Sequence, residues 1–370
     1  MVNDISALKQ LPKLFFKNDT MPVQLIYFVT TRCNASCAHC FYSAELNNPQ
    51  KKDMSLVEIE KMSKSMDDLL LLYLGGGEPF LRTDLPELAE IFYKNNNTRI
   101  IGIPTNAFLP SVMIPSIDRM CQKCPNANVL INVSIDDIDE AHEVFRKVPG
   151  GWKKLLETIA GIKELQKKHK NLAFGTNATF NKFNQDKIKE IYYYLRDEIK
   201  PDSININLIR GTPKDPQSKD IDIRKYKEVI SILQSDLKSG KLGYTTSSFQ
   251  NIINQNQART KELIHKTYED QKAHVECTAA RLIGVVYPDG EVFPCELLDS
   301  KFKLGNLRDV DYNMRTLWMS ERTKEVAKWI VDQKCFCTHE CFMSTNVMFD
   351  PKELFSNAII ATLQAPKRLS

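Results

Sequence analysis

Short apolar runs alternate with longer amphipathic segments between residues 24 and 210. The apolar runs predict strands at 24–29, 69–74, 99–104, 128–135, 172–180 and 203–209. The amphipathic segments predict helices that include 55–66, 85–94, 151–165 and 185–199. Ser55 followed by Glu58 resembles a capping box at the start of the first of these helices. Six β/α units in a row indicate a parallel sheet with helices outside, either a partial barrel or a doubly wound sheet.

The pattern changes after residue 210. A loop containing two prolines leads into two long polar helices, predicted at 222–239 and 247–272. Residues 281–296 then predict a β-hairpin that turns at Pro288-Asp289-Gly290. We therefore predict four parts: an N-terminal extension (1–21), a β/α region (22–210), a helical connector (211–275) and a small α+β domain (276–370).

Charge and composition narrow the class of protein. Lys plus Arg (50) nearly balance Asp plus Glu (46), so nothing favours nucleic acid or an anionic membrane as partner. No apolar run reaches the ~18 residues of a membrane span, and the first residues do not resemble a secretory signal. We expect a cytoplasmic, reducing location, where clustered cysteines bind metal or do redox chemistry more often than they form disulfides.

The first cysteine group follows the first predicted strand. Cys33, Cys37 and Cys40 are spaced C-x3-C-x2-C. Three thiolates on one loop can hold three irons of a [4Fe–4S] cubane and leave the fourth iron open. An open metal position is typical of a catalytic site. A zinc site that recruits His39 is the alternative, and this spacing suits it less well.

The second predicted strand ends in Gly76, Gly77 and Glu78. This is the carboxyl-end face on which barrel enzymes build their sites. Glycines there let the backbone approach a ligand closely, and a carboxylate can receive an ammonium group.

The cysteine loop and the Gly-Gly-Glu turn together resemble the radical S-adenosylmethionine (SAM) superfamily, over roughly residues 22–210. The resemblance implies a partial (β/α)6 TIM-like barrel whose three cysteines hold a [4Fe–4S] cluster with SAM on the open iron. It also implies that Gly76, Gly77 and Glu78 contact the methionyl amine. Reduction of such a cluster cleaves SAM to a 5′-deoxyadenosyl radical, which removes hydrogen from an unactivated C–H bond.

Several later strand ends match this family in kind. Ser134 and Asp136 are candidates for the ribose or methionyl part of SAM, and Arg146 for its carboxylate. Arg210 closes the sixth strand, where a buried arginine needs an anionic partner such as SAM or substrate. The alternatives are that Ser134 and Asp136 form a helix N-cap and that Arg146 lies in a surface loop.

The third strand ends in a further family-like turn. Thr105 and Asn106 resemble the family's Thr-Asn-Gly, with Ala107 in place of the usual glycine. Thr105 and Asn106 could also simply cap the turn.

The C-terminal region holds five more cysteines. They are Cys277, Cys295, Cys335, Cys337 and Cys341. They resemble the SPASM and Twitch extensions of radical SAM enzymes, which implies an auxiliary [4Fe–4S] cluster with one thiol to spare. We favour Cys337 and Cys341 over Cys335, and one cluster of the Twitch type over two. A zinc site with His339 as a competing ligand is the alternative.

The remaining cysteines form a C-x2-C pair before the fourth strand. Cys121 and Cys124 should lie on the amino-end face of the sheet, away from the site. We interpret them as structural thiols.

We therefore expect a radical SAM oxidoreductase or isomerase that receives electrons from a donor such as flavodoxin or ferredoxin. The auxiliary cluster would accept an electron from the substrate or bind it. Peptide-modifying members usually carry an N-terminal recognition domain, and only about twenty residues precede the first strand here. A small molecule (a sugar, an aminocyclitol or a nucleotide derivative) is therefore favoured over a peptide. A non-catalytic iron–sulfur electron-transfer protein is the remote alternative.

Overall fold

The computed structural model describes residues 20–242 and 248–356. Six parallel strands lie at its centre, each within two residues of its predicted start. They are β1 (Gln24–Thr30), β2 (Leu71–Gly76), β3 (Ile100–Thr105), β4 (Asn128–Ser134), β5 (Leu172–Phe180) and β6 (Ser203–Leu208). Residues 1–19 of the predicted N-terminal extension lie outside the described residues.

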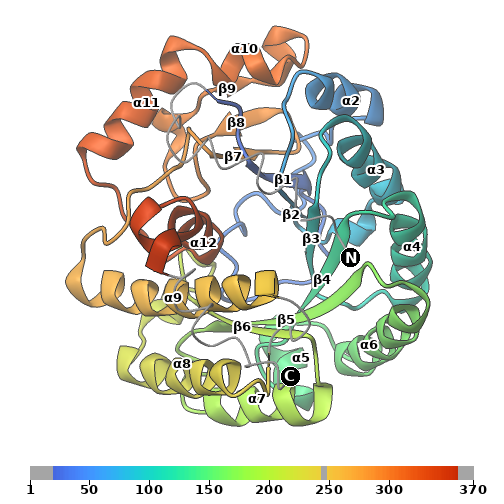
Figure 1. Ribbon diagram of the computed structural model, residues 1–370. Helices are drawn as coiled ribbons and strands as arrows, with labels where there is room; N and C mark the ends of the chain where they lie inside the picture. The colour runs from blue at the N-terminus through green and yellow to red at the C-terminus, as the bar shows by residue number, and fades with distance from the viewer. Residues whose placement is uncertain (1–19, 243–247, 357–370) are drawn as a thin grey trace, which may run out of the picture.

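The six strands follow one another in space in the same order as in the sequence. In a doubly wound sheet the strand order across the sheet reverses at a switch point. The unbroken order seen here therefore confirms the partial barrel. The helices pack outside the strands (Figure 1). They are α2 (Leu56–Lys64), α3 (Leu85–Asn95), α4 (Pro110–Lys123), α5 (Asp139–Arg146), α6 (Gly151–Lys168) and α7 (Ile188–Tyr194), and the last continues as a π-helical turn over Leu195–Ile199. The predicted capping box of Ser55 and Glu58 opens α2.

The C-terminal hairpin extends the barrel sheet. Strand β7 (Ile283–Val286) pairs in parallel with β1, with Gln24 opposite Ile283. It then turns antiparallel into β8 (Glu291–Phe293), as predicted, and β9 (Gly305–Asn306) adds to the edge. Backbone hydrogen bonding is therefore continuous across the boundary that we drew near residue 276. The division into domains stays a prediction.

Two helices bridge β6 and β1 on the open side of the barrel. They are α9 (Ser248–Asp270) and α12 (Glu340–Met348), which lie side by side (Figure 1). Lys261 of α9 donates to the carbonyl of Ile206 in β6, 2.8 Å away, and pairs with Glu340 of α12. Gln24 of β1 donates to the carbonyl of Cys341, 3.3 Å away. The remaining helices of this half are α8 (Ile223–Lys238), α10 (Met314–Trp318) and α11 (Glu321–Asp332).

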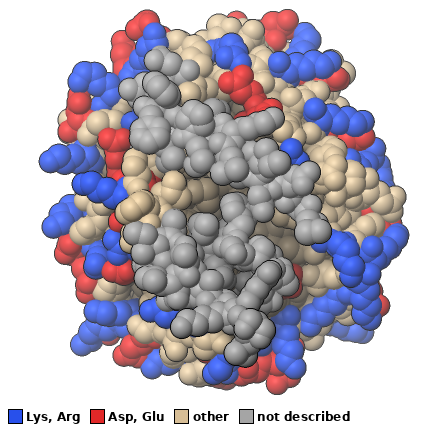
Figure 2. Space-filling model, viewed as in Figure 1, with Lys and Arg blue, Asp and Glu red and all other residues tan. Residues whose placement is uncertain are grey.

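The surface charge and the Cys121–Cys124 pair can be compared with the sequence predictions. Figure 2 shows Lys and Arg interspersed with Asp and Glu around the rim of the face seen in Figure 1. Among the described helices, none is long and apolar enough to cross a membrane. Cys121 and Cys124 are buried, and their carbonyls accept from the side chain of Asn171 at 3.2 and 3.0 Å. These bonds fit the structural role that we predicted for the pair.

Candidate active site

The cysteine loop leaves the carboxyl end of β1 and is held by neighbouring loops. The side chain of Asn47 forms two hydrogen bonds with the backbone of Cys33. The N–H of Cys33 donates to Asn47 Oδ1 (3.0 Å), and Asn47 Nδ2 donates to the Cys33 carbonyl (3.2 Å). The N–H of Ser36 donates to the carbonyl of Arg146, 3.1 Å away. The loop after β6 adds a bond from the N–H of Asp215 to the carbonyl of Ala38 (2.8 Å). Elements far apart in the sequence thus fix the positions of the thiols.

The three thiols of this loop lie close enough to influence one another's ionisation. Burial, and to a smaller degree the charges of Glu78, Cys37 and Cys40, raise the pKa of Cys33 to about 12. Burial and Cys37 raise the pKa of Cys40 to about 11. Burial also raises the pKa of Cys37, although Arg146 opposes it. The bare thiols are therefore protonated at neutral pH, and iron would displace their protons, as thiolate ligation requires. Three soft thiol ligands on one loop fit the ligand set of a cubane cluster with one open iron.

Gly76 and Gly77 lie directly against the cysteine loop. A Cβ added to Gly77 would stand 2.0 Å from the carbonyl oxygen of Arg32, and one on Gly76 would stand 2.4 Å from that of Thr30. Gly76 also has φ = +114°, a conformation that glycine adopts without strain. We predicted that these glycines allow close approach of a ligand. In the structure they allow close packing against the backbone of Thr30 and Arg32, just before Cys33. Contact of these glycines with SAM stays a prediction.

Glu78 is buried and accepts three hydrogen bonds from the protein. Its carboxylate accepts from Thr105 Oγ1 and from the backbone N–H groups of Asn106 and Phe80, at 2.8, 2.8 and 3.2 Å. Burial nevertheless raises the pKa of Glu78 to about 7, because the three donors only partly replace water. The carboxylate ties the end of β2 to the end of β3. Its predicted contact with an ammonium group remains untested.

The turn after β3 has the conformation that explains the family's usual glycine. Ala107 has φ = +62°, in the left-handed region. The N–H groups of Ala107 and Phe108 donate to the side chains of Thr105 and Asn106, each at 3.1 Å. The turn-capping interpretation of these two polar residues is therefore confirmed. The amide of Asn106 also donates to Asn34 Oδ1 at 2.7 Å, which links this turn to the cysteine loop.

Asp136 and Arg146, which we predicted separately, form a buried ion pair. Arg146 Nε lies 3.0 Å from Asp136 Oδ2, and Asp136 Oδ1 accepts from the N–H of Thr179 at 2.8 Å. Burial opposes ionisation of Asp136, but the charge of Arg146 lowers its pKa to about 2. Arg146 ends α5, so the surface-loop alternative was wrong. The N-cap alternative was also wrong, since Ile138 occupies that position; Ser134 ends β4.

Arg210 connects the barrel to the C-terminal cysteines. Its guanidinium lies over the ring of Phe41, 4.8 Å from the centroid, and 3.8 Å from the carboxylate of Glu296. Glu296 directly follows Cys295 and accepts a hydrogen bond from Nε2 of His339. Burial alone would raise the pKa of Glu296, but its neighbours His339 and Arg210 lower it. The anionic partner that we predicted for Arg210 is thus supplied in part by Glu296.

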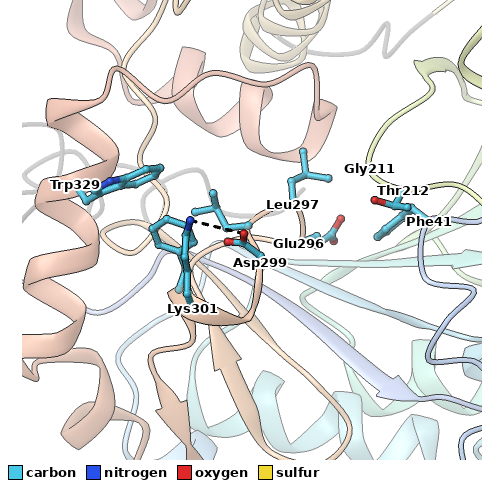
Figure 3. A pocket seen from close by; sticks show the side chains of 10 residues that line it. Phe41, Gly211, Thr212, Glu296, Leu297, Asp299, Lys301 and Trp329 are labelled. Carbon is cyan, nitrogen blue, oxygen red and sulfur yellow. Dashed lines mark ion pairs between the residues drawn. The ribbon is translucent and has the colours of Figure 1, made fainter.

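A cavity of about 510 Å³ opens beside this ion pair. Figure 3 shows Phe41 and Thr212 on its barrel side and Trp329 of α11 on the opposite side. The loop after Cys295 forms its floor, where Lys301 pairs with Asp299 at 3.8 Å. A ligand in this cavity would contact both the barrel and the segment that carries Cys295.

Four of the five C-terminal thiols interact with one another. Burial raises the pKa of Cys277 to about 11 and that of Cys295 to about 12, with added repulsion from Cys335. Burial, Cys277, Cys295 and Cys335 raise the pKa of Cys337 well above its ordinary value. Burial raises the pKa of Cys341 to about 12, and the strongest charges acting on it are those of Arg210, which lowers it, and Glu296, which raises it. This grouping differs from our preference for Cys337 and Cys341.

In the described ranges, no three or more His, Cys, Asp and Glu side chains are gathered for one metal ion. The iron and sulfide of a cubane separate its thiolates, so its ligands lie further apart than those of one zinc ion.

Two family models match the chain. Residues 27–195 match the radical SAM superfamily, and residues 277–342 match the SPASM iron–sulfur cluster-binding domain. The chain belongs to the radical SAM superfamily. Membership implies a [4Fe–4S] cluster that binds SAM, and the C-terminal match implies a domain that binds an auxiliary iron–sulfur cluster.

This radical SAM protein is similar to proteins with different names and functions. It is 28% identical over 233 residues to Fe-coproporphyrin III synthase of Methanosarcina barkeri, covering 61% of this chain and only 54% of that protein. It is 26% identical over 310 residues to the AdoMet-dependent heme synthase of the same organism, covering 80% of this chain and 82% of that one. SuiB of Streptococcus suis, crystallised with SAM, shares the fold at a TM-score of 0.59 and 16% identity, over 86% of this chain and 70% of SuiB.

Sequence reasoning missed the residues that position the others. Asn47 has φ = +57° and lies before Asn48 and Pro49, a turn-like run that could have drawn attention to it. Phe41 and Glu296 are adjacent to Cys40 and Cys295, and that proximity was their available signal.

Proposed function

We propose that this radical SAM enzyme removes hydrogen from a C–H bond of a small molecule bound between the barrel and the C-terminal cysteines. The observation that carries the proposal is the contact between Arg210, at the end of β6, and Glu296, beside Cys295. The cavity of about 510 Å³ next to this contact is within the size range of small-molecule sites. The residues in contact with a ligand there would come from both cysteine-bearing regions.

Cys33, Cys37 and Cys40 would hold the cluster that, with SAM, supplies a 5′-deoxyadenosyl radical, while the C-terminal thiols would hold a cluster that accepts an electron or binds substrate. The chain's own residues do the positioning. Glu78 and the Asp136–Arg146 pair fix the loops around the first site, and both are almost fully enclosed. Arg210 pairs with Glu296, which lines the cavity, so the wall there combines a carboxylate with a neighbouring guanidinium.

The relatives support the choice of a small molecule. Two of them, by name, make haem or coproporphyrin compounds, and the heme synthase matches over 82% of its own length. This support is for a small molecule as a class, which includes the sugar, aminocyclitol and nucleotide derivatives that we favoured from the sequence.

A peptide is the second candidate. SuiB has also been crystallised with its precursor peptide SuiA, and its fold matches this chain at a TM-score of 0.57. Trp329, which lines the cavity, is 38% exposed, so a peptide's side chain could enter beside it while the peptide backbone stays outside.

Anaerobic reconstitution with iron, sulfide, SAM and dithionite tests the reaction. We expect 5′-deoxyadenosine from the unmodified chain and none above background from Cys37→Ala. Cys121→Ala is the matched control, because that thiol is buried in the structural pair. Equal yields from the unmodified chain and Cys37→Ala would overturn the enzyme proposal. Adding a small-molecule filtrate of cell extract, or its peptide fraction, should show which one increases the yield.

A further inference from the structure

A second cavity, of about 390 Å³, lies over the cysteine loop. Cys33 and Cys37 border it together with the residues between them. Asn47, the residue that grips Cys33, and Leu46 complete one wall. This opening is therefore a place where solvent, or another molecule, comes near the two thiols of the SAM-cluster loop.

Two lysines from different elements stand at the rim of this cavity. Lys147 follows α5 in the left-handed conformation (φ = +56°), and Lys214 lies in the loop after β6. Both are exposed. The ammonium of Lys214 donates to the hydroxyl of Ser36, 2.6 Å away in the cysteine loop. Two lysines that are 67 positions apart in the sequence thus border the same cavity as Cys33 and Cys37.

These cations are not neutralised by acidic neighbours. Within the described part of the chain, neither Lys147 nor Lys214 forms an ion pair with a carboxylate. The nearest acids along the sequence are engaged locally: Asp215 caps the N–H of Gln217 at 2.9 Å, and Glu143 accepts from the N–H groups of Gly150 and Trp152. The rim therefore carries a local positive charge on a protein whose total charge is nearly balanced.

The cavity beside the C-terminal cysteines lacks this feature. Its lysine, Lys301, is paired with Asp299 (Figure 3), and Glu296 adds a second carboxylate. The cations at that cavity, Lys301 and the neighbouring Arg210, are thus each paired with a carboxylate, whereas the two rim lysines have no carboxylate partner among the described residues.

We propose that the rim formed by Lys147 and Lys214 is the docking surface for an acidic electron-carrier protein that reduces the cluster held by Cys33, Cys37 and Cys40. This rests on the proposed function, because reductive cleavage of SAM consumes one electron from outside. The carrier loses that electron: a flavin hydroquinone anion becomes a neutral semiquinone without releasing a proton. The lysines act by attracting and orienting the carrier, which raises its rate of association.

The test compares a double charge reversal, Lys147→Glu with Lys214→Glu, against a matched control, Lys170→Glu with Lys200→Glu. The control lysines are also exposed, lie just before β5 and β6 at the opposite end of the strands, and include one left-handed residue, Lys200. Both variants change the net charge equally. Reduced flavodoxin is the probe carrier, and dithionite is the small reductant that needs no docking surface.

With flavodoxin, the rim variant should form 5′-deoxyadenosine about tenfold more slowly than the unmodified chain and the control variant. With dithionite all three should be equally active. Surface plasmon resonance should show slower association of flavodoxin with the rim variant and a weaker dependence on salt concentration. An equal loss in the two variants, an equal loss with both reductants, or unchanged association would overturn the docking proposal. Failure of the unmodified chain with dithionite would instead count against the proposed function.

Discussion

The guanidinium of Arg146 and the carboxylate of Asp136 are enclosed together directly behind the cysteine loop, with Nε 3.0 Å from Oδ2. The pair joins the end of α5 to the segment after β4. Because the carbonyl of Arg146 also accepts from the N–H of Ser36, the loop that carries Cys37 rests on this pair.

Replacing Arg146 should therefore destabilise the whole protein. Arg146→Ala leaves the carboxylate of Asp136 buried without a counter-charge, and we expect the free energy of unfolding to fall by about 3–5 kcal/mol. Urea denaturation of the metal-free chain measures it. Arg32→Ala is the control, since Arg32 pairs with Asp53 while 55% exposed, and it should cost about 1 kcal/mol or less. Similar losses in both variants would show that the buried pair adds nothing.

The fold could largely be predicted because its signals are local. All six barrel strands and the hairpin were found from runs of apolar residues and from one turn. The pairing of β1 with β7 could not be found in this way, because Gln24 and Ile283 are 259 positions apart and nothing in either segment specifies its partner. Such pairing is decided by the packing of the complete barrel.

The sequence identified individual residues of the site but not which of them contact each other. Asp136 was assigned to SAM from its position after the fourth predicted strand, and Arg146 from the resemblance of its segment to the family. Their contact with each other depends on the path of α5, which brings Arg146 back over β4. Likewise, Ala107 departs from the family's glycine, and only its φ of +62° shows why glycine is usual there.

The two outer glycines of the Gly75–Gly77 run should respond very differently to substitution. A methyl group on Gly77 would meet the carbonyl oxygen of Arg32 at 2.0 Å, whereas on Gly75 its nearest neighbour is Pro104 Cγ at an ordinary 3.8 Å. Gly77→Ala must therefore move the backbone next to Cys33, and we expect the iron content to fall from about eight to about four per chain. Gly75→Ala should retain both clusters. Full iron content in Gly77→Ala would show that the loop can adapt.

Glu78 should make stability depend on pH. Burial raises its folded pKa to about 7, while in the unfolded chain it is about 4.3. Between these values the folded state binds more protons, so the contribution of Glu78 to stability falls as pH rises from about 4.3 to about 7, by roughly 3–4 kcal/mol, and is constant above.

Urea denaturation of the metal-free chain across this pH range measures the effect, as the difference between the unmodified chain and Glu78→Gln. That difference is needed because burial lowers the pKa of His39 to about 4 and of His142 to about 3, which gives a slope of opposite sign below about 6.5. Asp222→Asn is the control, since Arg224 already lowers the pKa of Asp222 to about 2. Parallel stability curves for Glu78→Gln and the unmodified chain would contradict the raised pKa.

The C-terminal thiols should separate into four ligands and one bystander. Cys277, Cys295, Cys335 and Cys337 interact with one another, whereas Cys341 lies in α12 among Arg210, Glu296 and Lys261. Cys335→Ala and Cys337→Ala should each lower the iron content to about four per chain, and Cys341→Ala should keep about eight. Iron and sulfide analysis with electron paramagnetic resonance of the reduced protein measures this, with Cys121→Ala as the buried-thiol control. Loss of the second cluster in Cys341→Ala, with retention in Cys335→Ala, would restore the pairing of Cys337 with Cys341 that the sequence favoured.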